Sequence, residues 1–175
     1  MSKILKEKVK ELRVKIDGLA QLTKELKPVE QCIVFDSRIG LDNNSYEIHK
    51  AYDSLILAKA WLGKVLGELG SKTPYPKDGT RKTVADIEPT AEVAKNLTID
   101  RDGGWEEINH IQRVDYLRQE INEAIKQNAS IWEIGIFDLM SGSFYDLIWK
   151  NLSEARFWLG FELQRIKDEQ NKEAL

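Results

Sequence analysis

The sequence is poor in the residues that most often build disulfides and metal sites, with one cysteine and two histidines in 175 residues. A single cysteine, Cys32, forms no intramolecular disulfide, and with His49 and His110 it gives no Cys/His set that binds zinc. We interpret Cys32 as a small core residue rather than a nucleophile, because it precedes the apolar run 33–35. The histidines are interpreted as surface or capping residues rather than general bases. We expect neither a metal nor a cofactor.

Long apolar runs are missing as well. None approaches the roughly 20 residues that a membrane-spanning helix needs, and the segment after Met1 turns polar too soon for a signal peptide. The composition is ordinary for a soluble protein, with 31% charged residues and a formal net charge of −3. We therefore expect a cytoplasmic protein that does not enter a membrane.

Sequence motifs of catalysis are also missing. No GxSxG, P-loop or GxGxxG sequence occurs with the required flanks. The segment 63–67, which contains two glycines, lies inside a predicted helix and is not a dinucleotide-binding motif. The best enzymatic interpretation is an all-α nucleotide pyrophosphatase, in which carboxylates three residues apart on a helix hold Mg²⁺. The residues of this kind are Glu106, Glu107, Glu120 and Glu123. The second acidic pair that such an enzyme needs is not formed convincingly by Glu154, Glu162, Asp168 and Glu169. We therefore predict a solvated acidic face and no enzyme.

A repeated helical pattern is the strongest positive feature. Residues 55–66 and 152–163 both read L-x-x-A-x-x-W-L-G-x-x-L. The apolar positions step by three and four, which places them on one face of an α-helix. We expect Trp61 and Trp158 to be largely buried. The glycine after each Trp-Leu pair is expected to permit close approach of a neighbouring backbone.

Further matches extend this repeat to both halves of the chain. The pattern V-x-x-L-R-x-x-I begins at Val9 and again at Val114, and a short apolar piece ending in Phe-Asp follows each, at residues 34–36 and 136–138. We infer a degenerate duplication, in which each unit is a helix, a connector and a second helix that folds back. The predicted fold is an all-α bundle of internally duplicated helical hairpins.

Start and stop signals give the element boundaries. Pro28 ends the first helix, while Gly70 followed by Pro74 ends the second. Asn43, Asn44 or Ser45 is expected to cap the second helix, and Ser141 or Ser143 the last. The helices are predicted over residues 3–27, 45–70, about 105–127 and about 143–171. One compact domain results, made of helical unit 1 (1–70), a connecting loop (71–103) and helical unit 2 (104–175).

The connecting loop is basic. Residues 72–82 hold four cationic side chains against Asp78, a local net charge of +3 in an acidic chain, with Tyr75 among them. A positive patch with an aromatic ring is typical of a phosphate or nucleotide contact, and a solvated loop without a ligand is the alternative. The patch is too short for a long polyanion, so we expect no binding to DNA or RNA.

The first unit also carries a motif of a known family. Asp36-Ser37-Arg38 precedes a helix that contains L-x-x-A-x-x-W and ends at Gly70. Over residues 30–70 this resembles the hairpin domain of phage anti-defence proteins of the anti-CBASS 2 and Thoeris anti-defence 1 families. The second unit lacks the Ser-Arg, and a long insert separates Arg38 from its helix.

The resemblance implies a phage-encoded helical protein of the host cytoplasm that forms homo-oligomers. It would sequester a nucleotide immune second messenger, of the cyclic oligonucleotide or cyclic ADP-ribose type, without cleaving it. A duplicated chain would build the same assembly from fewer copies. The residues expected to bind this ligand are Arg38, Tyr46, Tyr75, Lys77, Arg81 and Lys82. The alternative function is a helical interaction protein that inhibits a host or phage protein by direct binding.

Overall fold

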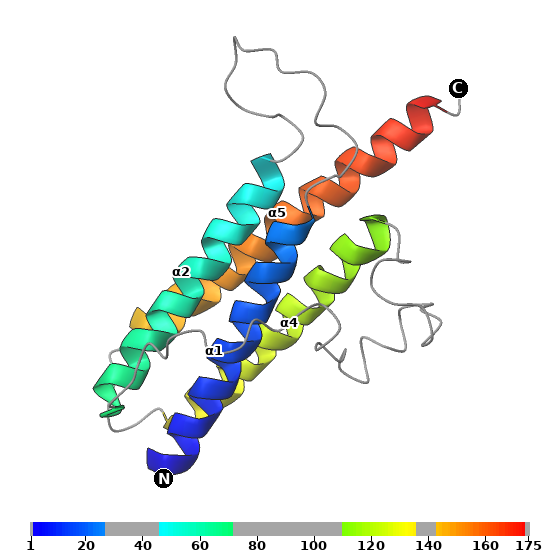
Figure 1. Ribbon diagram of the computed structural model, residues 1–175. Helices are drawn as coiled ribbons and strands as arrows, with labels where there is room; N and C mark the ends of the chain where they lie inside the picture. Colours follow the sequence, from blue (N-terminus) through cyan, green and yellow to red (C-terminus); the bar gives the residue numbers. More distant parts are fainter. Residues whose placement is uncertain (1, 27–45, 72–109, 136–142, 174–175) are drawn as a thin grey trace, which may run out of the picture.

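The fold is a bundle of α-helices, which confirms the predicted all-α class. The computed structural model describes residues 2–26, 46–71, 110–135 and 143–173, which are drawn in colour in Figure 1. No strand occurs within these ranges. The helices are α1 (Ser2–Glu25), α2 (Tyr46–Glu68), α4 (His110–Gly135) and α5 (Ser143–Glu173).

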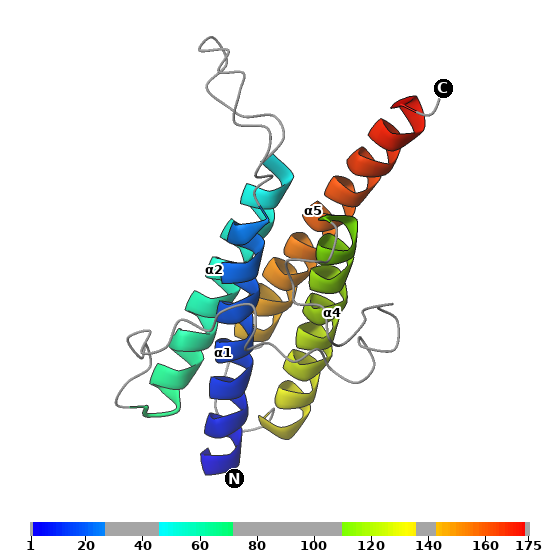
Figure 2. The same cartoon turned by 45° about the vertical axis from the view of Figure 1, so that its right-hand side comes forward.

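Neighbouring helices run antiparallel. α1 and α5 run in one direction along the bundle, α2 and α4 in the other, and each of α1 and α5 packs against both α2 and α4 (Figure 1). The first and last helices therefore occupy opposite corners of the bundle. The C-terminal turns of α5 extend past the ends of the other helices, as Figures 1 and 2 both show.

An apolar stripe on each helix builds the core. In α1 the stripe is Val9, Leu12, Ile16 and Leu19, all of them buried, while lysines and glutamates occupy the other faces. Burying one such side chain stabilises the fold by about 1.5–3 kcal/mol. Because each of these helices keeps a polar face, none in the described part of the chain is long and apolar enough to span a lipid bilayer.

A Schellman motif ends α2. Gly70 has a φ of 71°, the left-handed conformation that glycine adopts at low cost. The Gly70 N–H donates to the Gly67 carbonyl and the Ser71 N–H to the Leu66 carbonyl, both at 2.9 Å. The Lys6 ammonium also donates to the Gly70 carbonyl at 3.4 Å, which links the start of α1 to the end of α2. The stop predicted at Gly70 is confirmed.

α4 differs most from its predicted range of about 105–127, because it spans His110–Gly135. Tertiary contacts continue beyond residue 127. Ile131 packs against the core, and the Trp132 ring stacks on Tyr145 of α5 with centroids 5.2 Å apart. These contacts hold the last turns of α4 in a helix despite their local sequence.

The two halves bury equivalent positions. Leu12 of α1 and Leu117 of α4, 105 residues apart, are both buried, as are Leu55 of α2 and Leu152 of α5, 97 residues apart. This agreement describes the packing of the present chain, and the duplication itself stays a prediction. The connecting loop lies, apart from Ser71, outside the described residues.

The repeated tryptophans are less buried than expected. Trp61 and Trp158 are both partly exposed and pack against the outside of the core. The Trp61 ring lies tilted on Phe144 of α5, with centroids 5.8 Å apart. A ring of this size on the flank of the stripe reaches the bundle surface, whereas the leucine beside it is buried.

Candidate functional site

The predicted ligand-binding residues fall mostly outside the described part of the chain. Tyr46 is the one that the structure describes. The others are Arg38, Tyr75, Lys77, Arg81 and Lys82, all outside the described residues. Their role in ligand binding therefore stays a prediction, and the candidate site is built from Tyr46 and the surfaces near it.

Tyr46 lies where α2 meets α5. It is the first residue of α2, is 43% exposed, and makes an edge contact with the Trp158 ring of α5, with centroids 5.5 Å apart. The Lys50 ammonium lies 5.5 Å from the centroid of the Tyr46 ring, within the range of a cation–π contact. Tyr46 thus joins a surface formed by two helices.

Two phenylalanines extend this surface along α5. Phe157 and Phe161 are one turn apart, with ring centroids at 4.6 Å, and are 57% and 49% exposed. Phe157 also contacts Trp158, at 5.6 Å between centroids. We name Tyr46, Phe157, Trp158 and Phe161 the aromatic surface. Sequence reasoning missed both phenylalanines, although their position outside the apolar stripe of α5 was the signal that could have found them.

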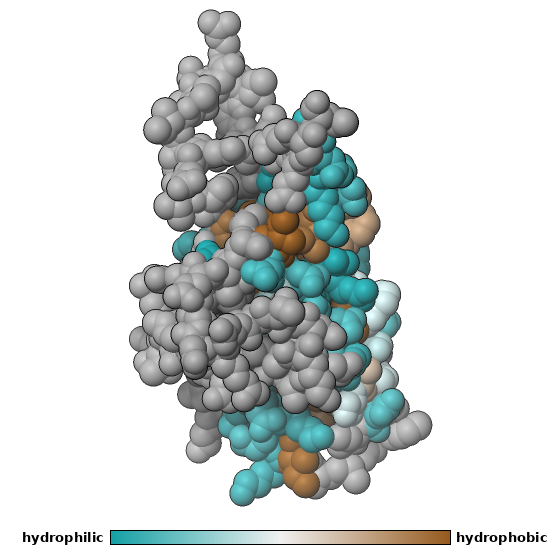
Figure 3. Space-filling view, turned by 90° about the vertical axis from the view of Figure 1, so that its right-hand side faces the viewer, coloured by the Kyte–Doolittle hydropathy of each residue, from teal (hydrophilic) through white to brown (hydrophobic). Residues whose placement is uncertain are grey.

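A groove between α4 and α5 is lined by polar and charged side chains. It has a volume of about 290 Å³. On the face of the molecule seen in Figure 3, the described surface is mostly hydrophilic, with smaller hydrophobic patches. We name as the polar groove the cavity lined by Asp115, Arg118, Gln119, Asn122, Glu123, Lys126 and Arg156.

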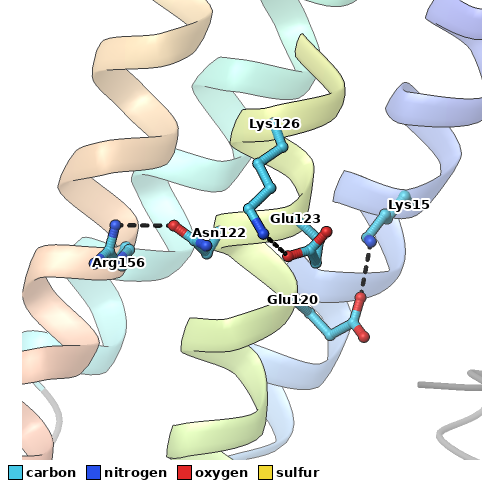
Figure 4. A network of polar contacts seen from close by, with 6 residues as sticks. All are labelled: Lys15, Glu120, Asn122, Glu123, Lys126 and Arg156. Carbon is cyan, nitrogen blue, oxygen red and sulfur yellow. Dashed lines mark hydrogen bonds and ion pairs between the residues drawn. The ribbon is translucent and has the colours of Figure 1, made fainter. Parts of the chain in front are cut away.

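One cation of the polar groove faces an uncharged acceptor. Arg156 of α5 donates from Nη1 to the Asn122 side-chain oxygen of α4 at 3.0 Å, as Figure 4 shows. By contrast, the Lys126 ammonium lies 2.7 Å from the Glu123 carboxylate. The Arg156–Asn122 contact positions the guanidinium without neutralising it, so Arg156 keeps its charge for an anionic ligand.

Arg118 lies against Gly160 of α5. A methyl group at Gly160 would lie 3.5 Å from Nη2 of Arg118, an ordinary van der Waals distance, so the nearest group is a side chain and not the backbone that was expected. The Nε of Arg118 is buried and has no hydrogen-bond partner in the described part of the chain. Asp115 of the same groove accepts a hydrogen bond from Gln119 at 2.9 Å.

The polar groove and the aromatic surface meet on α5, because Arg156 and Phe157 are adjacent residues and both are exposed. A guanidinium binds phosphate or carboxylate oxygens with charge-assisted hydrogen bonds. An exposed phenyl ring offers a face on which a base can stack. Arg156 and Phe157 together therefore offer one group that can bind an anion and one ring on which a base can stack.

Two glutamates are buried, so the predicted solvated acidic face is wrong for them. Glu120 is 2% exposed and its carboxylate lies 2.8 Å from the Lys15 ammonium of α1 (Figure 4). Glu162 is 1% exposed and lies 2.8 Å from Nη2 of Arg165. Helix packing brings Lys15 of α1 to Glu120, whereas Glu162 pairs with Arg165, three residues later on its own helix.

The remaining titratable candidates do not form a metal site in the described residues, which contain no group of three His, Cys, Asp or Glu side chains able to hold an ion. His49 is exposed on α2, as predicted, and His110 is the first residue of α4.

Burial raises the pKa of the Tyr116 hydroxyl well above its ordinary value, and the charge of Glu120 adds to that effect.

Comparisons with known proteins add no identification. No family model, curated protein or solved structure matches the chain. The resemblance to the anti-CBASS 2 and Thoeris anti-defence 1 families therefore stays a prediction from the sequence. Function has to be argued from the two surfaces described above.

Proposed function

We propose that the chain binds and sequesters a compact nucleotide-derived anion, of the cyclic oligonucleotide or cyclic ADP-ribose type, without cleaving it. One observation carries this proposal: Arg156, whose guanidinium donates to the uncharged Asn122 amide, is followed directly along α5 by Phe157, whose ring is exposed. A phosphate would bind the guanidinium while a base stacks on the ring. With the resemblance of residues 30–70, this makes the chain a phage-encoded protein that acts on an immune signal in the host cytoplasm.

The contact free energies and the volume of the polar groove favour a small ligand. Charge-assisted hydrogen bonds contribute about 1.5–3 kcal/mol each, and stacking of one base contributes about 1–3 kcal/mol. Two phosphate contacts and one stacked base together contribute about 4–9 kcal/mol before the costs of association, so the ligand needs all of them at once. The groove volume of about 290 Å³ is near the lower end for small-molecule sites. A compact anion fits this volume better than a long polyanion.

The test is calorimetric titration against cyclic dinucleotides, cyclic trinucleotides and cyclic ADP-ribose isomers. Arg156→Gln should weaken binding at least about tenfold, because it removes one charge-assisted contact. Lys167→Gln, an exposed position on the same helix with the same change of charge, should leave affinity unchanged. Chromatography should recover the ligand intact. A wild type that binds no member of the panel contradicts the proposal, and a cleaved ligand makes the chain an enzyme.

The basic loop has a separate test. Arg81→Glu with Lys82→Glu should abolish binding of the same ligand, because both cations are expected to contact phosphate. Helicity and melting temperature should stay nearly unchanged. If the double variant binds like the wild type while Arg156→Gln does not, the groove alone forms the site.

A second candidate is an interaction protein, favoured by the exposure of Phe157 and Phe161. The apolar stripes are buried in the chain's own core, so an apolar partner has to bind exposed side chains outside them. The aromatic surface groups two of these side chains, Phe157 and Phe161, in contact with each other. We propose a second copy of the chain as that partner, in line with the expected homo-oligomer. Light scattering should give a mass above the 20.1 kDa of one chain, and Phe157→Ser with Phe161→Ser should lower it. A wild-type monomer at tens of micromolar contradicts this candidate.

A further inference from the structure

Arg118 of α4 is a cation without a countercharge in the described part of the chain. No carboxylate there forms an ion pair with its guanidinium, and its buried Nε has no hydrogen-bond partner. Lys15, by contrast, reaches α4 from α1 and pairs with Glu120. A cation that loses part of its hydration without gaining a countercharge is unfavourable in a folded protein. A bound oxyanion would supply the missing partner of Arg118.

Arg118 and Arg156 occupy neighbouring turns of the contact between α4 and α5. The Nη2, Nε and Cζ atoms of Arg118 would lie 3.5, 3.6 and 3.7 Å from a methyl group at Gly160, so this guanidinium lies against α5. Four residues before Gly160, Arg156 donates to Asn122, which is four residues after Arg118 (Figure 4). Four residues of helix rise by about 6 Å. The polar groove is therefore lined by two guanidinium groups from successive helical turns.

The two carboxylates of the polar groove have neighbours of their own. Asp115 accepts a hydrogen bond from Gln119 at 2.9 Å, and Glu123 pairs with Lys126 at 2.7 Å. Neither carboxylate pairs with the two arginines. An anion that binds here has to be compact, because it must contact the arginines without approaching these carboxylates.

The first hairpin has a carboxylate at the corresponding place. The equivalents of Arg118, Asn122 and Arg156 are Arg13, Asp17 and Lys59. Lys59 pairs with Asp17 in the first hairpin. In the second hairpin an amide replaces that carboxylate, so a similar arrangement of two cations lacks its anion. An oxyanion bound between the arginines would take the part that Asp17 has in the first hairpin.

We propose that the polar groove binds one phosphate group between Arg118 and Arg156, with each guanidinium donating to a different phosphate oxygen. Charge-assisted hydrogen bonds of about 2.7–2.9 Å on two sides of one phosphate can bridge groups from successive helical turns. The inference rests on the function proposed above for its ligand class, a nucleotide-derived anion. It adds Arg118 as the second phosphate contact and places the base toward Phe157, which follows Arg156.

The test is an NMR titration of the whole isotope-labelled chain with inorganic phosphate at constant ionic strength, followed by the arginine Nε–H signals. Saturable shifts of the Arg118 and Arg156 signals are expected at millimolar phosphate. Arg118→Gln should weaken the phosphate affinity at least about tenfold, because one charge-assisted contact is lost. Lys167→Gln, an exposed position with the same change of charge, should leave the affinity within about twofold.

Asn122→Asp is a sharper variant, because it keeps both arginines. It places a carboxylate beside Arg156, as Asp17 lies beside Lys59, so the guanidinium gains a partner and phosphate is repelled. Phosphate affinity should fall at least about tenfold while helicity stays unchanged. Asn122→Ala removes the same amide without adding a charge and should lower the affinity less than Asn122→Asp does.

Two results would overturn the inference: phosphate shifts neither arginine signal, or Arg118→Gln and Asn122→Asp bind phosphate as tightly as the wild type. If Arg118→Gln fails to fold, Asn122→Asp decides alone. The proposed function fails separately. A cyclic nucleotide that binds the wild type and both variants equally contradicts this inference and leaves the proposed function standing. Loss of phosphate binding in both variants supports the inference even where no cyclic nucleotide binds the wild type, and in that case the proposed function is wrong.

Discussion

Each of the two hairpins, α1 with α2 and α4 with α5, has a polar contact between its helices at equivalent positions. The chemistry of this contact differs between the two hairpins. In the first, Lys59 of α2 pairs with the Asp17 carboxylate of α1. In the second, the equivalent residues are Arg156 and Asn122, and the carboxylate has become an amide. The geometry of the contact is kept while the countercharge is lost. Polar positions on this bundle can thus change charge without disturbing the packing beneath them.

Other equivalent positions also differ between the two hairpins. Phe157 and Phe161, which belong to the aromatic surface of α5, correspond to Ala60 and Lys64 of α2. The buried Glu162 of α5 corresponds to Val65. The cation paired with an amide, the two exposed phenylalanines and the two buried glutamates lie in the second hairpin. The first hairpin adds Tyr46 to the aromatic surface. We infer that the second hairpin carries most of the binding surfaces.

The largest expected effect tests whether the two hairpins share one core. Leu55→Ala and Leu152→Ala should each lower the free energy of unfolding by about 2–5 kcal/mol, because both side chains are fully buried. Urea unfolding measures this, with the exposed Leu57→Ala as a control expected to change stability by less than about 0.5 kcal/mol. If only one of the two leucine variants had a small loss of unfolding free energy, Leu55 and Leu152 would not be equivalent core positions.

A smaller loss is expected where the hairpins meet. Lys15 and Glu120 occupy equivalent positions of α1 and α4 and pair with each other. Lys15→Ala leaves a buried carboxylate without this cation and should cost about 2–3 kcal/mol. Lys10→Ala removes an exposed pair with Glu7 and should cost under about 0.5 kcal/mol. Equal melting temperatures for the two variants would show that the buried pair adds nothing.

The helix ends offer a third test. Gly70 ends α2, whereas the equivalent residue of α5, Lys167, lies inside a helix that continues to Glu173. Gly70→Ala should cost about 1 kcal/mol, because alanine is disfavoured at positive φ. Gly67→Ala, inside α2 and exposed, should instead stabilise by about 0.5–1 kcal/mol. Thermal melting that gives both changes the same sign would contradict this account.

The smallest effect concerns Tyr116, which corresponds to the exposed Glu11 of α1. The folded state keeps Tyr116 protonated because burial raises its pKa, while the unfolded chain loses this proton near the ordinary pKa of 10.0. The unfolded state then binds fewer protons, so stability falls as pH rises above that value. The slope of stability against pH above 10 should be shallower in Tyr116→Phe, by at most about 1.4 kcal/mol per pH unit. Identical slopes for both proteins would contradict a buried phenol.

The sequence by itself determined the helices and their buried stripes. The period of the apolar positions identified Leu55, Leu152 and their neighbours as core, and Gly70 marked the end of α2 to within two residues. These features depend on contacts within about one helical turn, which the local order of residues specifies.

Only the tertiary structure decided which polar residues meet. Glu120 is buried because α1 brings Lys15 to it, and the end of α4 extends because its last turns pack on α5. The pairing of Arg156 with Asn122 depends likewise on how α4 and α5 are placed against each other. Helical periodicity assigns each residue to a face, but the facing residue comes from a distant part of the chain. That choice is made by packing of the whole bundle.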